Sequence, residues 1–195
     1  MRRVWMRRRG REAARILACL ATAWLMAACA SEAQDFGVTI ESLETSRQAG
    51  HVQLVVHQDI RLSTEARAAL EHGVPLVIQV EARLRRSRGG NDVMTIERHF
   101  EIRYLPLSDH YQVMEGDGQQ QGTYPRLRHA LADLREVTLP LPGTLAGTGP
   151  WEAGARSRLL ASRLPRPMRL PAWFSARWRH DSGWRVEAVR WPEPT

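Results

Sequence analysis

The side chains best suited to acid–base chemistry lie in two neighbouring stretches of alternating sequence, residues 74–86 and 93–105. Six charged or titratable residues occupy alternate positions there: Glu81, Arg83, Glu97, His99, Glu101 and Arg103. If the stretches pair as a hairpin, all six lie on one outer face of a sheet. An imidazole beside two carboxylates can act as a general acid and base or bind a metal ion. His99, Glu101 and Glu81 are therefore the candidate catalytic residues.

A plainer interpretation of the same face competes with catalysis. Alternating signs are typical of exposed strands, where each cross-strand ion pair contributes roughly 0.2–1 kcal/mol, and we favour this interpretation. Ser108, Asp109 and His110 have the residue types of a catalytic triad, but adjacent residues in a turn do not converge in space. The sequence contains no His-Glu-x-x-His, no Gly-x-Ser-x-Gly and no phosphate-binding glycine loop. We expect no metal and no cofactor.

Aromatic residues near the C-terminus suggest binding instead. Four of the five tryptophans that follow residue 30 lie between residues 173 and 191, and tryptophans among arginines can form a cation–π surface for sugars, lipid headgroups or a partner protein. Three prolines in residues 164–171 predict an extended surface segment. The candidate binding residues are Trp173, Phe174 and Arg177, whereas Trp178 and Trp184 are expected in the core.

The elements that position these residues are predicted from periodicity. Alternation predicts strands over residues 51–62, 74–86 and 93–105, followed by shorter strands over residues 110–115, 155–164 and 184–191. Helices are expected after a cap at Ser63 or Thr64, ending at Gly73, and again from Thr123 through the Leu-rich stretch that follows. The fold class is α+β, with an antiparallel β-sheet or β-sandwich and two short helices.

Three stretches resemble a family of bacterial envelope proteins known as domain of unknown function 4390. They are LSTEARAALEHGVPLVIQVEARL (residues 62–84), HFEIRYLPLSDHYQV (99–113) and RLPRPMRLPAWFSARWRHDSGWRVEAVRW (163–191). The likeness covers about residues 38–191, and the hairpin loop RRSRGGND departs from it. The resemblance implies one domain after a signal or anchor, and no catalytic residues. It also implies the outer domain of a membrane sensor kinase as a candidate partner, because family members are often encoded beside such a kinase.

Residues 1–30 have the composition of an export signal. Residues 1–15 carry seven arginines and one acid, and residues 16–28 form an almost unbroken apolar run. This run is shorter than the roughly 20 apolar residues that cross a bilayer, so we expect a leader that is cleaved or lipidated. Ala28-Cys29-Ala30 is typical of cleavage before Ser31. Residues 26–29 also resemble a lipobox, in which Cys29 would carry the lipid.

Residues 31–195 are then a single β-rich domain with little net charge. The chain carries +7, but seven of its 28 basic residues and one of its 21 acids lie in the leader, which leaves 21 against 20. No basic field remains for nucleic acid. Both cysteines, Cys19 and Cys29, also lie in the leader, so the domain has no disulfide and no thiol nucleophile.

Two functions fit this sequence. The leading hypothesis is a non-enzymatic envelope protein of the periplasm that binds another envelope protein, with membrane association through the leader or a lipid on Cys29. The alternative is a hydrolase that acts on an envelope substrate, with an acid–base site around His99. A pocket around His99 would favour the enzyme, whereas a flat charged face with an apolar patch elsewhere would favour the binding module.

Fusing residues 1–40 to a reporter that is active only after export tests the predicted leader. We expect an active reporter, because the basic, apolar and small-residue regions occur in the order of a secretory signal. A silent reporter with the full-length fusion present in the cell would contradict export.

Overall fold

Long strands and short helices alternate along the part of the chain that the structure describes. The computed structural model describes residues 36–87, 92–116, 118–145, 150–189 and 191. The strands there are β1 (Gly37–Gln48), β2 (His51–Arg61), β3 (Leu76–Arg86), β4 (Asp92–Leu105), β5 (His110–Glu115), β6 (Gln119–Tyr124), β7 (Glu136–Pro140), β8 (Trp151–Leu159) and β9 (Arg185–Ala188). The α-helices there are α2 (Thr64–Glu71), α3 (Leu127–Asp133) and α4 (Arg166–Phe174), and the 3-10 helices are η1 (Ala161–Arg163) and η2 (Ala176–Trp178).

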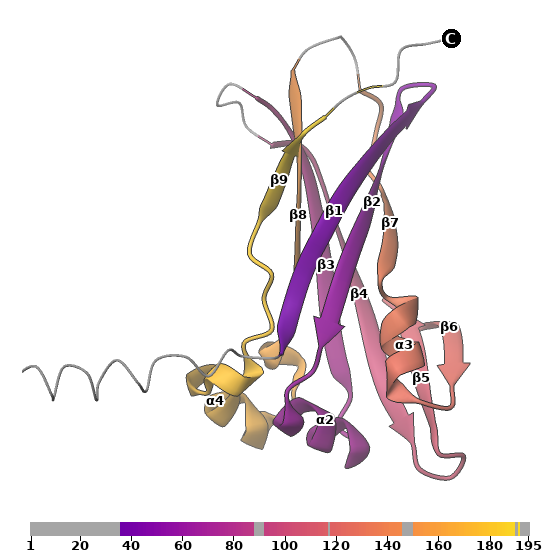
Figure 1. Cartoon of the computed structure of the whole chain (residues 1–195), viewed down its shortest axis with the longest axis vertical. Coiled ribbons are helices and arrows are strands. Elements are labelled where there is room, and N and C mark those ends of the chain that lie inside the picture. The colour runs from indigo at the N-terminus through magenta and orange to yellow at the C-terminus, as the bar shows by residue number, and fades with distance from the viewer. Residues whose placement is uncertain (1–35, 88–91, 117, 146–149, 190, 192–195) are drawn as a thin grey trace, which may run out of the picture. The chain divides into compact units, whose positions relative to one another are not determined.

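The strands form two antiparallel sheets (Figure 1). The smaller sheet has the order β1-β2-β7, and the larger has the order β6-β5-β4-β3-β8-β9. Tight connections such as the β1–β2 and β3–β4 hairpins account for the antiparallel pairing. The α+β prediction is confirmed, although three α-helices replace the two that were expected.

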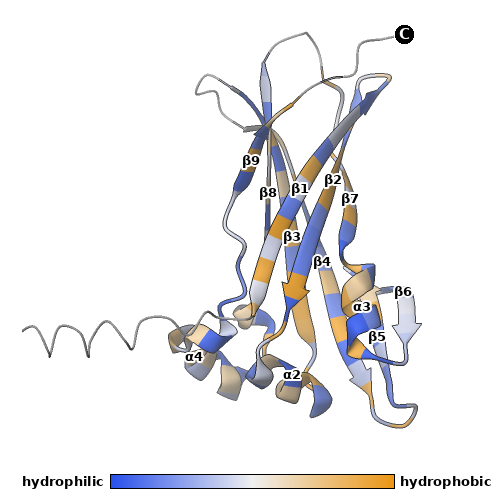
Figure 2. Cartoon of the chain, viewed as in Figure 1, coloured by the Kyte–Doolittle hydropathy of each residue, from blue (hydrophilic) through white to orange (hydrophobic). Residues whose placement is uncertain are grey.

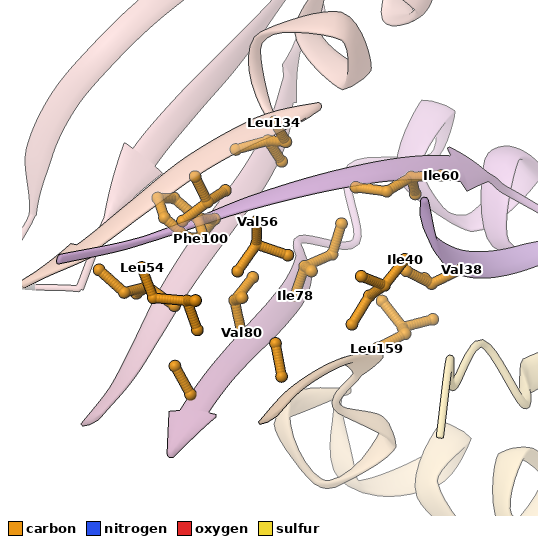
Figure 3. Packing of buried hydrophobic residues seen from close by; sticks show 14 of the residues in the cluster. Val38, Ile40, Leu54, Val56, Ile60, Ile78, Val80, Phe100, Leu134 and Leu159 are labelled. Atoms are coloured by element: carbon orange, nitrogen blue, oxygen red, sulfur yellow. The ribbon is translucent and has the colours of Figure 1, made fainter. Parts of the chain in front are cut away.

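Apolar residues at alternate positions bury one face of each sheet. Figure 2 shows the alternation along β1 and β2, where buried and exposed positions follow one another. On β3, Ile78, Val80 and Ala82 are buried on the side that faces away from the charged residues. The two buried faces share one hydrophobic cluster, in which Val56 of the smaller sheet lies near Ile78 and Phe100 of the larger sheet (Figure 3). A shift of one residue in any register would turn these side chains toward solvent.

Helix α2 follows its sequence signals closely. The hydroxyl oxygen of Ser63 accepts a hydrogen bond from the backbone N–H of Ala66 at 3.1 Å, which satisfies an otherwise free donor of the first turn. The helix ends before Gly73, which has a φ of 84°. Glycine adopts this left-handed conformation without steric cost. Both predicted ends of the helix are therefore confirmed.

The predicted helix from Thr123 begins later than expected. Residues 119–124 form the edge strand β6, and α3 starts only after Pro125. Proline disfavours the α conformation of the residue before it, so Tyr124 stays extended. A Cβ at Gly122 would lie 2.2 Å from the Tyr124 hydroxyl oxygen, so only glycine lets this ring fold back over the strand. The expected cap at Thr123 was wrong.

The predicted extended segment over residues 164–171 is also wrong, because α4 covers most of it. Pro165 is the cap of α4 and Pro167 lies in its first turn, where backbone N–H groups have no partner within the helix. Pro171 alone removes a hydrogen bond from the helix interior.

Three strands in the C-terminal half also differ from the prediction. The strand expected over 155–164 is β8, which starts earlier, at Trp151, and ends at Leu159. Strand β9 is shorter than the expected 184–191. Strand β7 was not predicted, although Val137 and Leu139 alternate with exposed residues as in a half-buried strand.

Residues 36–195 form one compact unit by their contacts, and the whole hydrophobic cluster belongs to it. We therefore expect this part to fold without the residues before it. The predicted leader (residues 1–30) and Cys29 lie outside the described residues. Within the described ranges, no helix has both the length and the apolar character needed to cross a membrane.

A buried histidine joins the start of α2 to the end of β8. His180 is 1% exposed, and its Nε2 accepts the Ser63 backbone N–H at 3.0 Å. Its carbonyl oxygen accepts the Leu159 N–H at 2.8 Å, and its ring centroid lies 5.3 Å from that of Phe36. Because Nε2 is an acceptor here, the ring is neutral with its proton on Nδ1. Burial lowers the pKa of His180 below its ordinary value.

Acidification should therefore destabilise the wild-type domain through His180. As pH falls below the ordinary histidine pKa of about 6.5, the unfolded chain takes up a proton more readily than the buried His180 does. The free energy of unfolding therefore decreases over this range. We expect the free energy of unfolding to fall more between pH 7 and pH 5 in the wild type than in His180→Gln, whose amide oxygen can still accept the Ser63 N–H. Urea unfolding of residues 31–195 at several pH values measures this, and equal slopes for the two proteins would contradict it.

Candidate functional site

The pairing of β3 with β4 places the candidate acid–base residues on one face of the larger sheet. Gln79 lies opposite His99, and Glu81 lies opposite Glu97. Neighbouring positions on these strands carry the buried core residues, so this set points away from the core. We call this surface the outer face. The predicted hairpin and the shared outer face of these residues are confirmed, whereas a catalytic role for His99, Glu101 or Glu81 stays a prediction.

The carboxylates of the outer face already have partners. Glu97 accepts a hydrogen bond from Gln79 Nε2 at 2.6 Å, and Gln79 Oε1 accepts one from Arg158 Nε at 2.9 Å. Glu101 forms an ion pair with Arg103. Glu81 of β3 lies between Arg156 of β8 and Glu97 of β4. The positive charge of Arg156 offsets the repulsion between the two carboxylates.

The same pattern extends to the end of β8. Arg156 Nε donates to Asp181 at 2.9 Å, and this bond holds the pKa of Asp181 below its ordinary value. Arg85 pairs with Glu152 at 2.9 Å on the neighbouring strands. Apart from Glu81 opposite Glu97, the charged residues described on the outer face lie beside residues of opposite charge, which is the pattern that the plainer interpretation of the sequence expects.

Two hollows flank His99. One has a volume of about 410 Å³ and the other about 530 Å³, and both include Glu115 and Gly116 in their lining. Space for a small molecule therefore exists beside the imidazole. Among the described residues, however, no side chain hydrogen-bonds to His99 or pairs with it. A base for catalysis normally has a second group that orients it, or a nucleophile within hydrogen-bond reach, and His99 has neither in the described structure.

Other catalytic or metal arrangements are not assembled from the described residues. Asp109 accepts a hydrogen bond from the Tyr104 hydroxyl at 2.8 Å, and His110 Nδ1 contacts the backbone oxygen of Ser108 at 2.5 Å. Ser108, Asp109 and His110 therefore form no triad. Across the ranges that the structure covers, no cluster of three or more His, Cys, Asp or Glu is placed to hold a metal ion.

Helix α4 carries an exposed apolar face, which we call the α4 face and define as Leu170, Trp173 and Phe174. These side chains are 63%, 59% and 83% exposed, respectively. Their spacing of three and four residues puts them on one side of the helix, while Ala172 points into the core at 3%. The expected exposure of Trp173 is confirmed, and its binding role stays a prediction together with that of Phe174.

Arginines surround the α4 face. No acid occurs in the sequence between Glu152 and Asp181, whereas residues 163–179 contain five arginines. Arg177 forms an ion pair with Glu65 of α2, which fixes η2 against that helix. The side chains of Arg166 and Arg179 are exposed, and their guanidinium groups make no hydrogen bond or ion pair with another described residue. The rim of the α4 face is therefore positively charged.

The tryptophans divide between core and surface. Trp178 is half-buried and packs against the hydrophobic cluster, as expected. Trp184 is not in that cluster, so its expected core position was wrong. Its ring lies 3.8 Å from the guanidinium carbon of Arg83 on the outer face, and a Cβ on Gly154 would lie 3.2 Å from Arg83 Nε. Glycine at that position leaves room for the stacked pair.

Two important residues escaped prediction from the sequence. Leu170 was missed because the prolines of residues 164–171 suggested an extended segment. Its helical spacing from Trp173 and Phe174 was nevertheless a usable signal. His180 was missed because nothing local distinguishes a histidine that is buried by partners distant in sequence.

Comparison with known protein families decides where this chain belongs. The sequence model of the family described as Domain of unknown function (DUF4390) matches residues 36–187, which is more than half of the chain. The chain belongs to this family. The DUF4390 match includes the outer face and the α4 face, and it confirms the resemblance seen in the three sequence stretches. No curated protein and no solved structure matches the chain.

The exposure of Trp173 predicts a small effect of its removal on stability. We expect Trp173→Ala to change the free energy of unfolding by less than about 0.5 kcal/mol, because surface substitutions rarely exceed this. Leu164→Ala, which truncates a side chain that is 1% exposed, should lower the free energy of unfolding by about 2–5 kcal/mol. Denaturant unfolding of both variants gives the comparison. A loss for Trp173→Ala as large as that for Leu164→Ala would mean that the ring is packed.

Proposed function

We propose that this protein is an exported, non-enzymatic accessory domain of the cell envelope that works by binding another envelope component. The observation that carries the proposal is the α4 face. Three large apolar side chains are exposed together on one short helix, whereas most other large apolar residues of the described chain are buried or half-buried. Aromatic residues beside arginines are typical anchors of binding surfaces.

The sequence of the leader supports the location. A basic, apolar and small-residue order precedes Phe36, so export to the periplasm or envelope is part of the proposal. Cys29 offers a site for a lipid. An envelope protein is the partner class suggested by the family, with the outer domain of a membrane sensor kinase as the specific candidate.

A hydrolase with its site at His99 is the second candidate. The hollows on both sides of His99 favour it, since they offer room for a substrate. The occupied carboxylates and the unpartnered imidazole favour the binding module. We therefore place the outer face second and use His99→Ala as a control below.

Binding to isolated envelope membranes tests the proposal. Purified residues 31–195 are mixed with membranes from cells that lack this gene, and the sedimented fraction is measured. We expect the wild type to sediment with the membranes and Trp173→Gln/Phe174→Gln to lose at least about tenfold in affinity, because both anchors are removed. Glutamine is a good helix former, so α4 should persist.

Two matched controls complete this experiment. Leu107→Gln removes a fully exposed apolar side chain from the β4–β5 turn, and His99→Ala removes the imidazole of the outer face. Both should bind as the wild type does. Loss of binding in His99→Ala with normal binding by the α4 double variant would contradict the proposal and promote the outer face.

A further inference from the structure

We infer that the α4 face docks onto the surface of a membrane that contains anionic lipids. This inference rests on the proposed function and names the component that the domain binds. Helix α4 has the features of an interfacial helix, namely an apolar side with tryptophan, phenylalanine and leucine, and arginines around it. Tryptophan is enriched at membrane–water interfaces, where its ring lies at the level of the headgroups.

Charge complementarity is the first argument for a lipid surface. The domain as a whole is nearly neutral, yet the 17 residues from Arg163 to Arg179 contain five arginines and no acid. Glu65 neutralises Arg177, while Arg166 and Arg179 remain exposed. A concentrated positive charge beside an apolar face suits anionic headgroups, to which each arginine near the surface adds affinity.

The position of the chain's entry into the domain is the second argument. The Phe36 ring packs against His180, and the His180 N–H donates to Trp178 O at 3.1 Å, directly after α4 and η2. The start of β1 and helix α4 therefore lie at the same end of the domain (Figure 1). Phe36, the first described residue, therefore lies at the α4 end of the domain.

The length of the leader limits how far that end can lie from an anchor. Phe36 lies seven positions after Cys29, and an extended chain over this distance spans at most about 25 Å. A lipid on Cys29, or the apolar run before it, would therefore hold the α4 end of the domain near the bilayer. The α4 face would add a second point of attachment at this end of the domain.

Protein-free vesicles test the inference. Residues 31–195 are mixed with vesicles of equal parts phosphatidylglycerol and phosphatidylcholine, and with vesicles of phosphatidylcholine alone. We expect binding to the anionic vesicles, with a blue shift of tryptophan fluorescence as Trp173 leaves water. Trp173→Gln/Phe174→Gln should lose at least about tenfold in partitioning to anionic vesicles, since the buried apolar area supplies much of the affinity.

A charge variant with a matched control separates arginine contacts from general attraction. Arg166→Gln/Arg179→Gln should weaken binding to anionic vesicles by about tenfold or more, and added salt should have a smaller effect on this variant than on the wild type. Arg126→Gln/Arg128→Gln removes two exposed arginines near the start of α3, away from the α4 face, and should bind nearly as the wild type does. Thermal melting of every variant confirms that it is folded.

The outcomes distinguish this inference from the proposed function. Binding to envelope membranes through the α4 face without binding to anionic vesicles would overturn the inference and leave the proposed function standing, with a protein on the α4 face. Vesicle binding that survives Trp173→Gln/Phe174→Gln would also overturn the inference. Binding to neither vesicles nor envelope membranes would overturn both.

Discussion

Burial of one apolar face from each sheet in a shared cluster is the interaction on which the rest of the structure depends. Each fully buried Val, Leu or Ile contributes about 1.5–3 kcal/mol, and residues 36–195 contain no cysteine that could form a disulfide in its place. The alternation of β2, and of β3 apart from the buried Gln79, fixes which side of each strand enters the cluster. The opposite side is thereby committed to polar residues, and the ion-pair pattern around Glu97 and Arg158 follows from that division.

The elements that were correctly predicted carry their signals locally. The hairpin of β3 and β4 has long, clean alternation, and α2 has a capping serine and a terminating glycine. Strand β6 begins with three consecutive glutamines and depends on pairing with β5, which sequence periodicity does not reveal. Helix α4 could not be predicted from its proline content, because proline disfavours a helix interior but is tolerated at the cap and in the first turn, where Pro165 and Pro167 lie.

The candidate site divides in the same way. The outer face could be predicted because it depends only on strand parity. The engagement of Glu97 by Gln79 could not, since it depends on rotamers and on Arg158 of a strand far away in sequence. The exposure of Trp173 was predicted on the wrong grounds, from an extended segment, and it is a helix that presents Leu170 beside it.

The outermost strands β6 and β7 also affect how copies of this domain meet one another. An unpaired strand edge is a template for cross-β association when it is long, flat and apolar. Strand β6 presents three consecutive exposed glutamines over only six residues, and β7 ends at Pro140, which has no N–H to donate. A second copy of the domain therefore finds a poor template for strand pairing at β6 and at β7.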